Sequence, residues 1–299
     1  MNSASLRVLT PAKVNLILRV LERRPDGFHA VWSLMQTVGL HDELTLTIQP
    51  GGTPRIDLRC DHAMLAADQS NLVYRAARLV VERADRAVNL SIILTKRIPL
   101  GAGLGGGSSD AAAAILGLAR LLGLNWSVEE MAEVGQQLGS DVPFFFLAPA
   151  AYVTGRGEQV RPVQVIGDRW IALVNPGFPV ETKWAYQQLS STRSTVRPLS
   201  PALQLLAGRS VLDWSEVVTL AENDFEAPVF ARHPVLAQIK QQLLAQGAEA
   251  ALLSGSGATM FGVFPEQAGA ERAAAVFARD PNMKAFAVPT VGAPVTIVD

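Results

Sequence analysis

A glycine-rich stretch in the first half of the chain holds the residues with the clearest chemical potential. It consists of Pro99, Leu100, Gly101, Ala102, Gly103, Leu104, Gly105, Gly106, Gly107, Ser108 and Ser109. Glycine has no Cβ, so such a loop can adopt positive φ and lie directly against a ligand. Residues 108–110 favour the cap and first turn of a helix, which the alanines after them continue. Free amides at the start of that helix would face the loop, and the pattern predicts a phosphate site.

Two better-known phosphate loops do not match these residues. A P-loop ends in Gly-Lys-Ser/Thr, whereas Gly107 is followed by Ser108. The dinucleotide pattern G-x-G-x-x-G is met by Gly101, Gly103 and Gly106. However, no acidic residue closes a following strand about 20 residues later, where a ribose partner is expected. An NAD-binding oxidoreductase is the alternative from another class of enzyme.

Two separate segments supply a lysine, an amide and a carboxylate. Lys13 and Asn15 lie two positions apart in an expected strand over residues 12–20, so their side chains project from one face. Asp141 follows a glycine turn and precedes an apolar run at 142–147 that we expect to be a strand. An isolated carboxylate there needs a cation or hydrogen-bond donors. A solvated edge for the lysine and a capping role for the aspartate are the alternatives.

A turn and a second loop of small residues are further candidates for binding. Residues 25–27, Pro-Asp-Gly, predict a turn that presents Phe28 and His29 together. A surface histidine and a packing aromatic are the alternative interpretation of that pair. The second loop contains Ser254, Gly255, Ser256, Gly257 and Thr259. A simple turn would explain the glycines of this loop but not its hydroxyl side chains.

Together these segments resemble the GHMP small-molecule kinases, the family of galacto-, homoserine, mevalonate and phosphomevalonate kinases. Residues 99–109 are similar to the second motif of the family, and residues 254–259 are similar to the third. The resemblance implies an ATP-dependent kinase whose glycine loop wraps the nucleotide phosphates. It also implies that Mg²⁺ bridges those phosphates, with Ser108 or Ser109 as a candidate ligand.

The N-terminal segments narrow the resemblance within the family. Pro-Ala-Lys-Val-Asn-Leu at residues 11–16 and Asp-Gly-Phe-His at residues 26–29 are similar to members that act on a cytidine-diphosphate-linked methylerythritol in isoprenoid precursor synthesis. The usual turn in those members is Asp-Gly-Tyr-His, so Phe28 lacks one hydroxyl but keeps the ring face for stacking. A homoserine or mevalonate kinase is the alternative within the family. A non-catalytic ligand sensor of the same fold is another.

The resemblance also implies roles for the candidate residues. The segment Gly-Ser-Asp-Val-Pro-Phe-Phe around Asp141 carries the catalytic base of the family, and Lys13 would be its partner. Substrate contacts are implied for Asn15, Phe28, His29, Thr182 and Tyr186. Phe28 and Tyr186 would stack on either side of cytosine, with Trp184 as the competitor for the second ring.

We expect an α+β chain with two domains. By resemblance to the family, residues 1–167 form an ATP-binding and catalytic domain like domain 2 of ribosomal protein S5. Residues 168–299 form a ferredoxin-like substrate domain by the same resemblance. Within the first domain, alternating apolar residues predict separate strands at 31–38 and 42–49.

Composition excludes several other classes of protein. The chain has 26 basic and 27 acidic residues, a formal net charge of -1, so no broad field favours nucleic acid or an anionic membrane. A single cysteine, Cys60, excludes an internal disulfide and a cysteine-rich zinc site. We find neither a signal-peptide pattern nor an apolar run long enough to span a membrane. The sequence predicts a cytoplasmic protein that acts on a small molecule as a monomer or weak homodimer.

Overall fold

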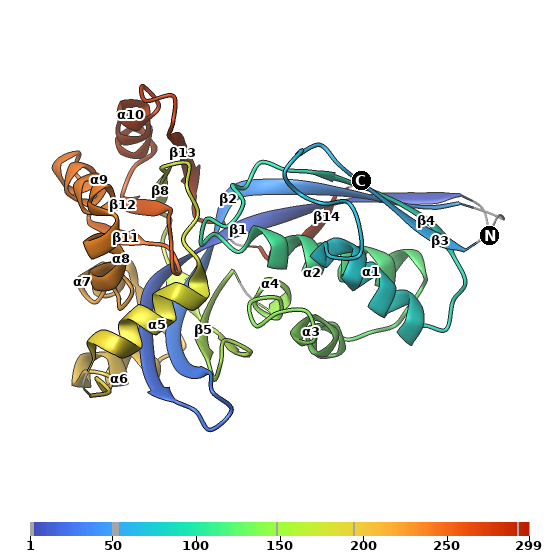
Figure 1. The fold of residues 1–299 in the computed structure, drawn as a ribbon, viewed down its shortest axis with the longest axis horizontal. Helices are drawn as coiled ribbons and strands as arrows, with labels where there is room; N and C mark the ends of the chain where they lie inside the picture. The colour runs from blue at the N-terminus through green and yellow to red at the C-terminus, as the bar shows by residue number, and fades with distance from the viewer. Residues whose placement is uncertain (1–2, 50–53, 148, 194, 292, 299) are drawn as a thin grey trace.

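Two long antiparallel strands, β1 (Ala4–Arg23) and β2 (His29–Gln49), extend from one half of the molecule into the other (Figure 1). Residues 11–20 of β1 are buried without interruption, because other elements cover both faces of this stretch. Strand β1 pairs with β2 from the beginning of the chain and with two short strands from its last third. The computed structural model describes residues 3–49, 54–147, 149–193, 195–291 and 293–298.

The larger sheet is built around this pair. Its other strands are β3 (Arg55–Cys60), β4 (Asn89–Thr95), β5 (Ala150–Thr154), β6 (Gln159–Pro162), β10 (Glu222–Asn223) and β14 (Thr296–Val298). The order is β10, β1, β2, β4, β3; β14 also pairs with β1, and β5 and β6 continue from β2. Because β10 and β14 come from the last third of the sequence, distant segments meet on β1.

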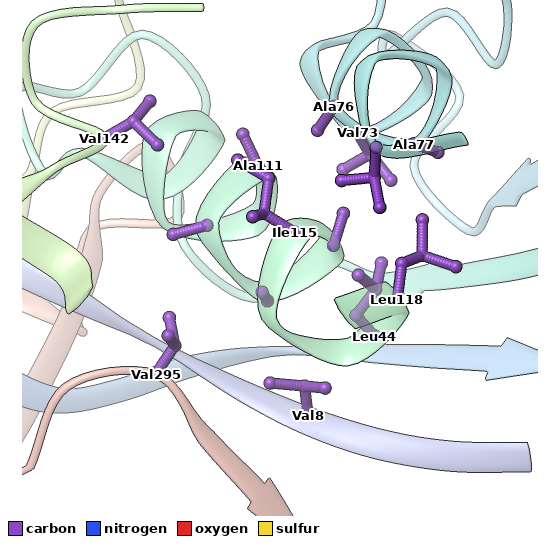
Figure 2. Close-up of a cluster of buried hydrophobic side chains, with 14 of the residues drawn as sticks. Val8, Leu44, Val73, Ala76, Ala77, Ala111, Ile115, Leu118, Val142 and Val295 are labelled. Atoms are coloured by element: carbon purple, nitrogen blue, oxygen red, sulfur yellow. The ribbon is translucent and has the colours of Figure 1, made fainter. Parts of the chain in front are cut away.

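Helices cover one face of the larger sheet (Figure 1). They are α1 (Leu72–Arg83), α2 (Gly106–Leu121), α3 (Val128–Gln136) and α4 (Phe144–Leu147). Figure 2 shows buried side chains of α2, such as Ile115, with Val73 of α1 on one side and Val8 of β1 on the other. Small residues let α2 approach the strands closely, since a Cβ on Gly117 would lie 2.3 Å from Leu46 Cδ1. The alanines of α2 thus serve packing as well as helix propensity.

The second half of the chain forms a smaller sheet in the order β11, β12, β8, β13. These strands are β8 (Trp170–Asn175), β11 (Ala250–Leu253), β12 (Met260–Phe264) and β13 (Lys284–Pro289). A short parallel pair joins β7 (Gln164–Ile166) and β9 (Val211–Asp213). The helices are α5 (Thr182–Thr192), α6 (Pro201–Ala207), α7 (Trp214–Thr219), α8 (Glu226–Arg232), α9 (Pro234–Ala245) and α10 (Gln267–Phe277). The boundary expected between residues 167 and 168 stays a prediction.

No helix in the described ranges combines the length and the apolar character needed to cross a bilayer. The alternation of strands and helices is that of a mixed α+β protein, as the sequence predicts.

Two elements differ from the sequence prediction. The strands predicted at 31–38 and 42–49 form one continuous strand, β2, because a shift of register opposite Pro11 and Ala12 absorbs the residues between them. The run at 142–147, predicted as a strand, contains helix α4 instead. A short apolar run that is buried all round has no periodicity, and its residues therefore fit either a strand or a helix.

The start of α2 also differs from the prediction. We expected a side-chain cap from residues 108–110, but the helix begins at Gly106 after the N-cap Gly105, whose φ is 71°, and no side chain caps it. A Cβ on Gly105 would lie 2.9 Å from Phe145 Cζ and 3.0 Å from Lys13 Cγ, so a larger residue would clash. The first amides of α2 are therefore not bonded by a serine side chain.

A buried ion triad fixes α2 to the sheet. Lys96 Nζ donates to Asp110 Oδ2 at 2.8 Å and also to Asp42, and the three side chains are at most 2% exposed. Asp110 accepts a further bond from Thr10 Oγ1 at 2.8 Å, and Asp42 accepts one from the Ile98 amide at 2.8 Å. These bonds join α2 to β1, to β2 and to the segment that leads into the glycine loop.

One cation is shared by two carboxylates in this triad. Burial raises the pKa of Asp110 to about 7; Lys96 opposes the shift and Asp42 adds to it. Burial by itself would lower the pKa of Lys96, but the two carboxylates raise it above its ordinary value. Lys96 is therefore charged at neutral pH, and its removal would leave two buried acids without a counter-charge.

We predict that Lys96→Met lowers the free energy of unfolding by about 3–5 kcal/mol near neutral pH, because it leaves both acids unpaired. Urea unfolding measures this loss. A buried acid with a raised folded pKa binds a proton that the unfolded chain releases, so its contribution becomes less favourable as the pH rises through that window. Without Lys96, which opposes the rise in the pKa of Asp110, that pKa is higher still, and the penalty at high pH is larger than in the wild type. The loss should therefore be smaller near pH 5 than near pH 8.

The control for this experiment is Lys284→Met, which removes an exposed lysine and should change stability by less than about 0.5 kcal/mol. Equal losses in the two variants would contradict the role assigned to the triad.

Candidate active site

The catalytic candidates meet in a cleft between the two halves of the chain. Its outer part has a volume of about 940 Å³, and its inner part lies against the glycine loop. The side chains that line both parts are Asp141, Arg156, Thr182 and Tyr186. The inner part adds Lys13, Asn15 and Gly103, and the outer part adds Phe28 and His29. The fold thus brings together most of the residues predicted from four separate segments.

Lys13 occupies the centre of the inner part. Its side chain is 4% exposed, and Nζ donates to Asn15 Oδ1 at 2.7 Å and to the carbonyl oxygen of Gly103 at 2.8 Å. Asn15 Nδ2 in turn donates to Ser33 Oγ at 2.9 Å, which orients the amide so that its oxygen faces the lysine. Burial lowers the pKa of Lys13, and the nearby Asp141 opposes that shift. The lysine therefore connects β1 with the glycine loop.

Asp141 stands where the inner and outer parts of the cleft join. Its Oδ2 lies 3.9 Å from Lys13 Nζ, which is an ion pair without a close hydrogen bond. The carboxylate side chain is 33% exposed, so it has room for a ligand. It lies in the turn after α3, and the buried aromatic residues of α4 come directly after that turn in the chain. The arrangement combines an accessible acceptor with a nearby buried cation.

The glycine loop packs against the loop between β11 and β12. Ser254 Oγ donates to the Gly103 carbonyl oxygen at 2.9 Å, and the Thr259 amide donates to the Ala102 carbonyl oxygen at 3.2 Å. A Cβ on Gly103, whose φ is 77°, would lie 2.0 Å from the carbonyl oxygen of Ser254. Only glycine permits this contact between two main chains.

Polar side chains hold the second loop in place. Asn223 Nδ2 donates to the carbonyl oxygens of Leu253 at 2.7 Å and of Gly255 at 2.8 Å. Ser256 Oγ lies 2.9 Å from Thr182 Oγ1, which ties the start of α5 to this loop. The sequence does not single out Asn223, because one asparagine at the end of a two-residue strand carries no distinctive signal.

The structure places the predicted aromatic residues in three different surroundings. Tyr186 lines the cleft; its ring stacks on His29 at 5.2 Å and meets Phe225 edge-on at 4.8 Å. Phe28 is 58% exposed at the outer rim. Trp184 lies against a different hollow, with the Arg232 guanidinium 4.4 Å over its ring. Of the two competing rings, Tyr186 is therefore the one that faces Asp141 and His29.

Three cations of the cleft were not predicted from the sequence. Arg23, Arg156 and Lys183 line its outer part, and the Arg156 guanidinium lies 5.4 Å over the Phe28 ring. Arg156 is held between two glycines in the turn between β5 and β6. Its Gly-Arg-Gly pattern is the one signal that could have found it. The cleft thus offers positive charge between the aromatic rim and Asp141.

Comparison with protein families identifies both halves of the chain. The model described as "GHMP kinases N terminal domain" matches residues 71–148, and the model described as "GHMP kinases C terminal" matches residues 202–281. A 4-diphosphocytidyl-2-C-methyl-D-erythritol kinase of Syntrophotalea carbinolica is 42% identical over 285 residues, which cover 95% of this chain and 98% of that protein. The protein of the same name from Citrifermentans bemidjiense is 38% identical and covers 96% of this chain and 99% of its own length.

Comparison with solved structures gives the same result as comparison with these relatives. A 4-(cytidine 5'-diphospho)-2C-methyl-D-erythritol kinase superposes with a TM-score of 0.77 at 32% identity, covering 96% of this chain and all of that one (100%). A homoserine kinase from Cytophaga hutchinsonii superposes with a TM-score of 0.74, 98% of this chain and 97% of that one covered, but it is 19% identical and shares the fold alone. The two-domain fold expected from the resemblance is confirmed. This chain belongs to the GHMP kinase family and, within it, to the 4-diphosphocytidyl-2-C-methyl-D-erythritol kinases.

Proposed function

We propose that this protein transfers the γ-phosphate of ATP to the 2-hydroxyl of 4-(cytidine 5'-diphospho)-2-C-methyl-D-erythritol in isoprenoid precursor synthesis. The observation that carries the proposal is the placement of Asp141 3.9 Å from Lys13, whose ammonium group is bonded to the glycine loop. A carboxylate, a cation and a row of free amides in one cleft are the parts that phosphoryl transfer to an alcohol requires.

In this mechanism, Asp141 accepts the proton of the substrate hydroxyl as the oxygen attacks the γ-phosphorus and ADP leaves. Lys13 places a positive charge 3.9 Å from the Asp141 carboxylate, and this attraction helps to hold the carboxylate in place for the reacting hydroxyl. Asn15 fixes the position of Lys13 through the 2.7 Å hydrogen bond. Much of the rate enhancement in phosphoryl transfer comes from alignment and charge neutralisation, which the rigid inner part of the cleft supplies.

The triphosphate would lie over residues 99–109, where the uncapped amides of α2 and the helix dipole favour negative charge. Mg²⁺ would supply charge neutralisation at these phosphates. Among the described residues no group of three or more His, Cys, Asp or Glu could hold a metal ion. Mg²⁺ commonly depends on substrate phosphates and few protein ligands, so the site is compatible with it. Ser108 or Ser109 would hold it; Ser109 Oγ is buried and has no hydrogen-bond partner among the described residues.

The outer part of the cleft would hold the cytidine diphosphate. Phe28 and Tyr186 offer ring faces for the base, and His29 and Thr182 offer polar groups beside them. Arg156 provides positive charge for the diphosphate. A homoserine or mevalonate substrate would leave this aromatic and cationic surface unused, and this consideration favours the cytidine compound.

The ATP-binding part would comprise residues 1–167 and the substrate part residues 168–299. The near-neutral charge, -1 at pH 7, gives no reason to expect a nucleic-acid or membrane partner. We propose a cytoplasmic enzyme that works as a monomer or weak homodimer.

The proposed activity is tested with purified protein, γ-labelled ATP and a panel of alcohols. We expect label to be transferred to the cytidine-diphosphate-linked methylerythritol and not to homoserine or mevalonate. Transfer to either of those alcohols instead would contradict the proposal, as would reduction of a substrate by NADH.

Asp141→Asn should lower kcat by about 10²- to 10⁴-fold, because an amide cannot accept the hydroxyl proton. The affinity for ATP, measured by calorimetry, should change little, since Asp141 lies outside the glycine loop. A variant that turns over at the wild-type rate would show that another group is the base.

Gly103→Ala should weaken ATP binding by about 10- to 100-fold, equivalent to about 1–3 kcal/mol. The new Cβ would force the glycine loop away from the second loop. Gly123→Ala is the matched control: Gly123 also has positive φ, 66°, but nothing lies within 4 Å of its Cβ position. The control should lose about 1 kcal/mol of stability and keep its affinity for ATP. Similar affinities in the two variants would count against the loop contact.

A further inference from the structure

Ser190 of α5 links the His29 turn to Tyr186. Its Oγ lies 2.9 Å from His29 Nε2 and 2.9 Å from the carbonyl oxygen of Tyr186. A hydroxyl group has one hydrogen to donate, and a carbonyl oxygen can only accept. If both bonds are made, the hydroxyl hydrogen goes to Tyr186, and Ser190 Oγ accepts a hydrogen bond from His29 Nε2.

This arrangement leaves a lone pair on the other ring nitrogen of His29. Burial, and to a smaller extent the charge of Arg23, lower the pKa of His29 below its ordinary value, so the ring is neutral at pH 7. With the proton on Nε2, Nδ1 is an acceptor. No hydrogen bond to Nδ1 occurs among the residues that the structure describes, and the ring lines the outer part of the cleft.

We propose that Ser190 is a positioning residue for base specificity: it keeps the His29 proton on Nε2, so that Nδ1 accepts a hydrogen bond from the amino group of cytosine. Uracil has a carbonyl oxygen where cytosine has this amino group. Two acceptors would then face each other, and a uracil compound is disfavoured. The inference rests on the proposed function, since it concerns recognition of the cytosine end of that substrate.

The contacts around Ser190 explain why it can hold this position before substrate binds. Its hydroxyl bonds to the carbonyl four residues earlier in the same helix, which fixes the side chain without help from a ligand. Tyr186 is itself held edge-on against Phe225, and the His29 ring stacks on Tyr186 with an angle of 19° between the planes. The acceptor on His29 is therefore preorganised by neighbours on rigid elements.

The first test reads the proton position directly, without substrate. The protein contains four histidines, and two-bond ¹H–¹⁵N correlation spectra of ¹⁵N-histidine-labelled enzyme distinguish the two ring tautomers. His29→Asn identifies the His29 signals. We expect the Nε2–H tautomer in the wild type and a mixture of both tautomers in Ser190→Ala. Ser190→Thr, which keeps the hydroxyl, should restore the wild-type pattern.

Ser191→Ala is the matched control, because its hydroxyl donates to the Gln188 carbonyl oxygen at 2.9 Å rather than contacting the histidine. It should leave the His29 signals unchanged. An Nδ1–H tautomer in the wild type, or a Ser190→Ala spectrum identical to the wild-type spectrum, would overturn the proposal.

The second test measures kcat and KM for the cytidine compound and its uridine counterpart. Ser190→Ala should raise KM for the cytidine compound by about 3- to 10-fold, the effect of one weakened neutral hydrogen bond, with kcat nearly unchanged. Its preference for cytosine over uracil should fall by about 10-fold, because a ring that moves its proton to Nδ1 can donate to uracil. An unchanged preference would refute the role in specificity.

The two tests separate this inference from the proposed function. If wild-type enzyme phosphorylates neither compound, the proposed function fails, and the role in specificity fails with it. In that case the spectra still decide whether Ser190 sets the proton on His29. If turnover occurs but the tautomer is wrong, the proposed function stands and the inference about Ser190 fails.

Discussion

The buried ammonium group of Lys13 is the contact on which the geometry of the site depends. A buried cation is costly unless hydrogen-bond acceptors surround it. Here the acceptors come from β1 itself and from the glycine loop, and Asp141 adds a negative charge 3.9 Å away. The lysine cannot be satisfied unless these three segments are in place. Its burial therefore makes the fold and the proposed catalytic geometry depend on each other.

The phosphate site that we propose consists of main-chain amides, and such a site places strong demands on packing. It has no lysine of its own within the loop, so its attraction for phosphate depends on how well the amides and the helix dipole are aligned. The structure holds the loop from two sides. Ser254 and its neighbours approach it from the second half of the chain, and the buried triad of Lys96 anchors α2 from the sheet side. Glycines and alanines allow both approaches, because larger side chains would collide with the facing main chain or strands.

The sequence predicted the parts of the site that have a local signature. Their spacing suggested that Lys13 and Asn15 share a face, and in the structure both side chains are buried and bonded to each other. The glycine pattern suggested an anion site, which stays a prediction. Elements whose type depends on tertiary contacts were harder to predict from the sequence. The run at 142–147 became a helix because burial on all sides removes any period, and the start of α2 moved to Gly106 because a glycine with positive φ replaced the expected cap. The triad could not be predicted, since Asp42, Lys96 and Asp110 are far apart in sequence and each looks like an ordinary charged residue.

The two ends of the cleft are built differently, and this difference has a physical reason. The chemical end consists of side chains that are buried and bonded to strands and loops, as for Lys13 at 4% exposure. The end that would take the base is made of a turn and a helix, with Phe28 58% exposed. Binding interactions remote from the reacting atoms help to hold a hydroxyl in a reactive position. At the reacting groups themselves, a misplacement of about 1 Å can cost about 100-fold in rate. A rigid inner site joined to a more open outer one is thus the arrangement expected of an enzyme that recognises a long substrate at one end and modifies it at the other.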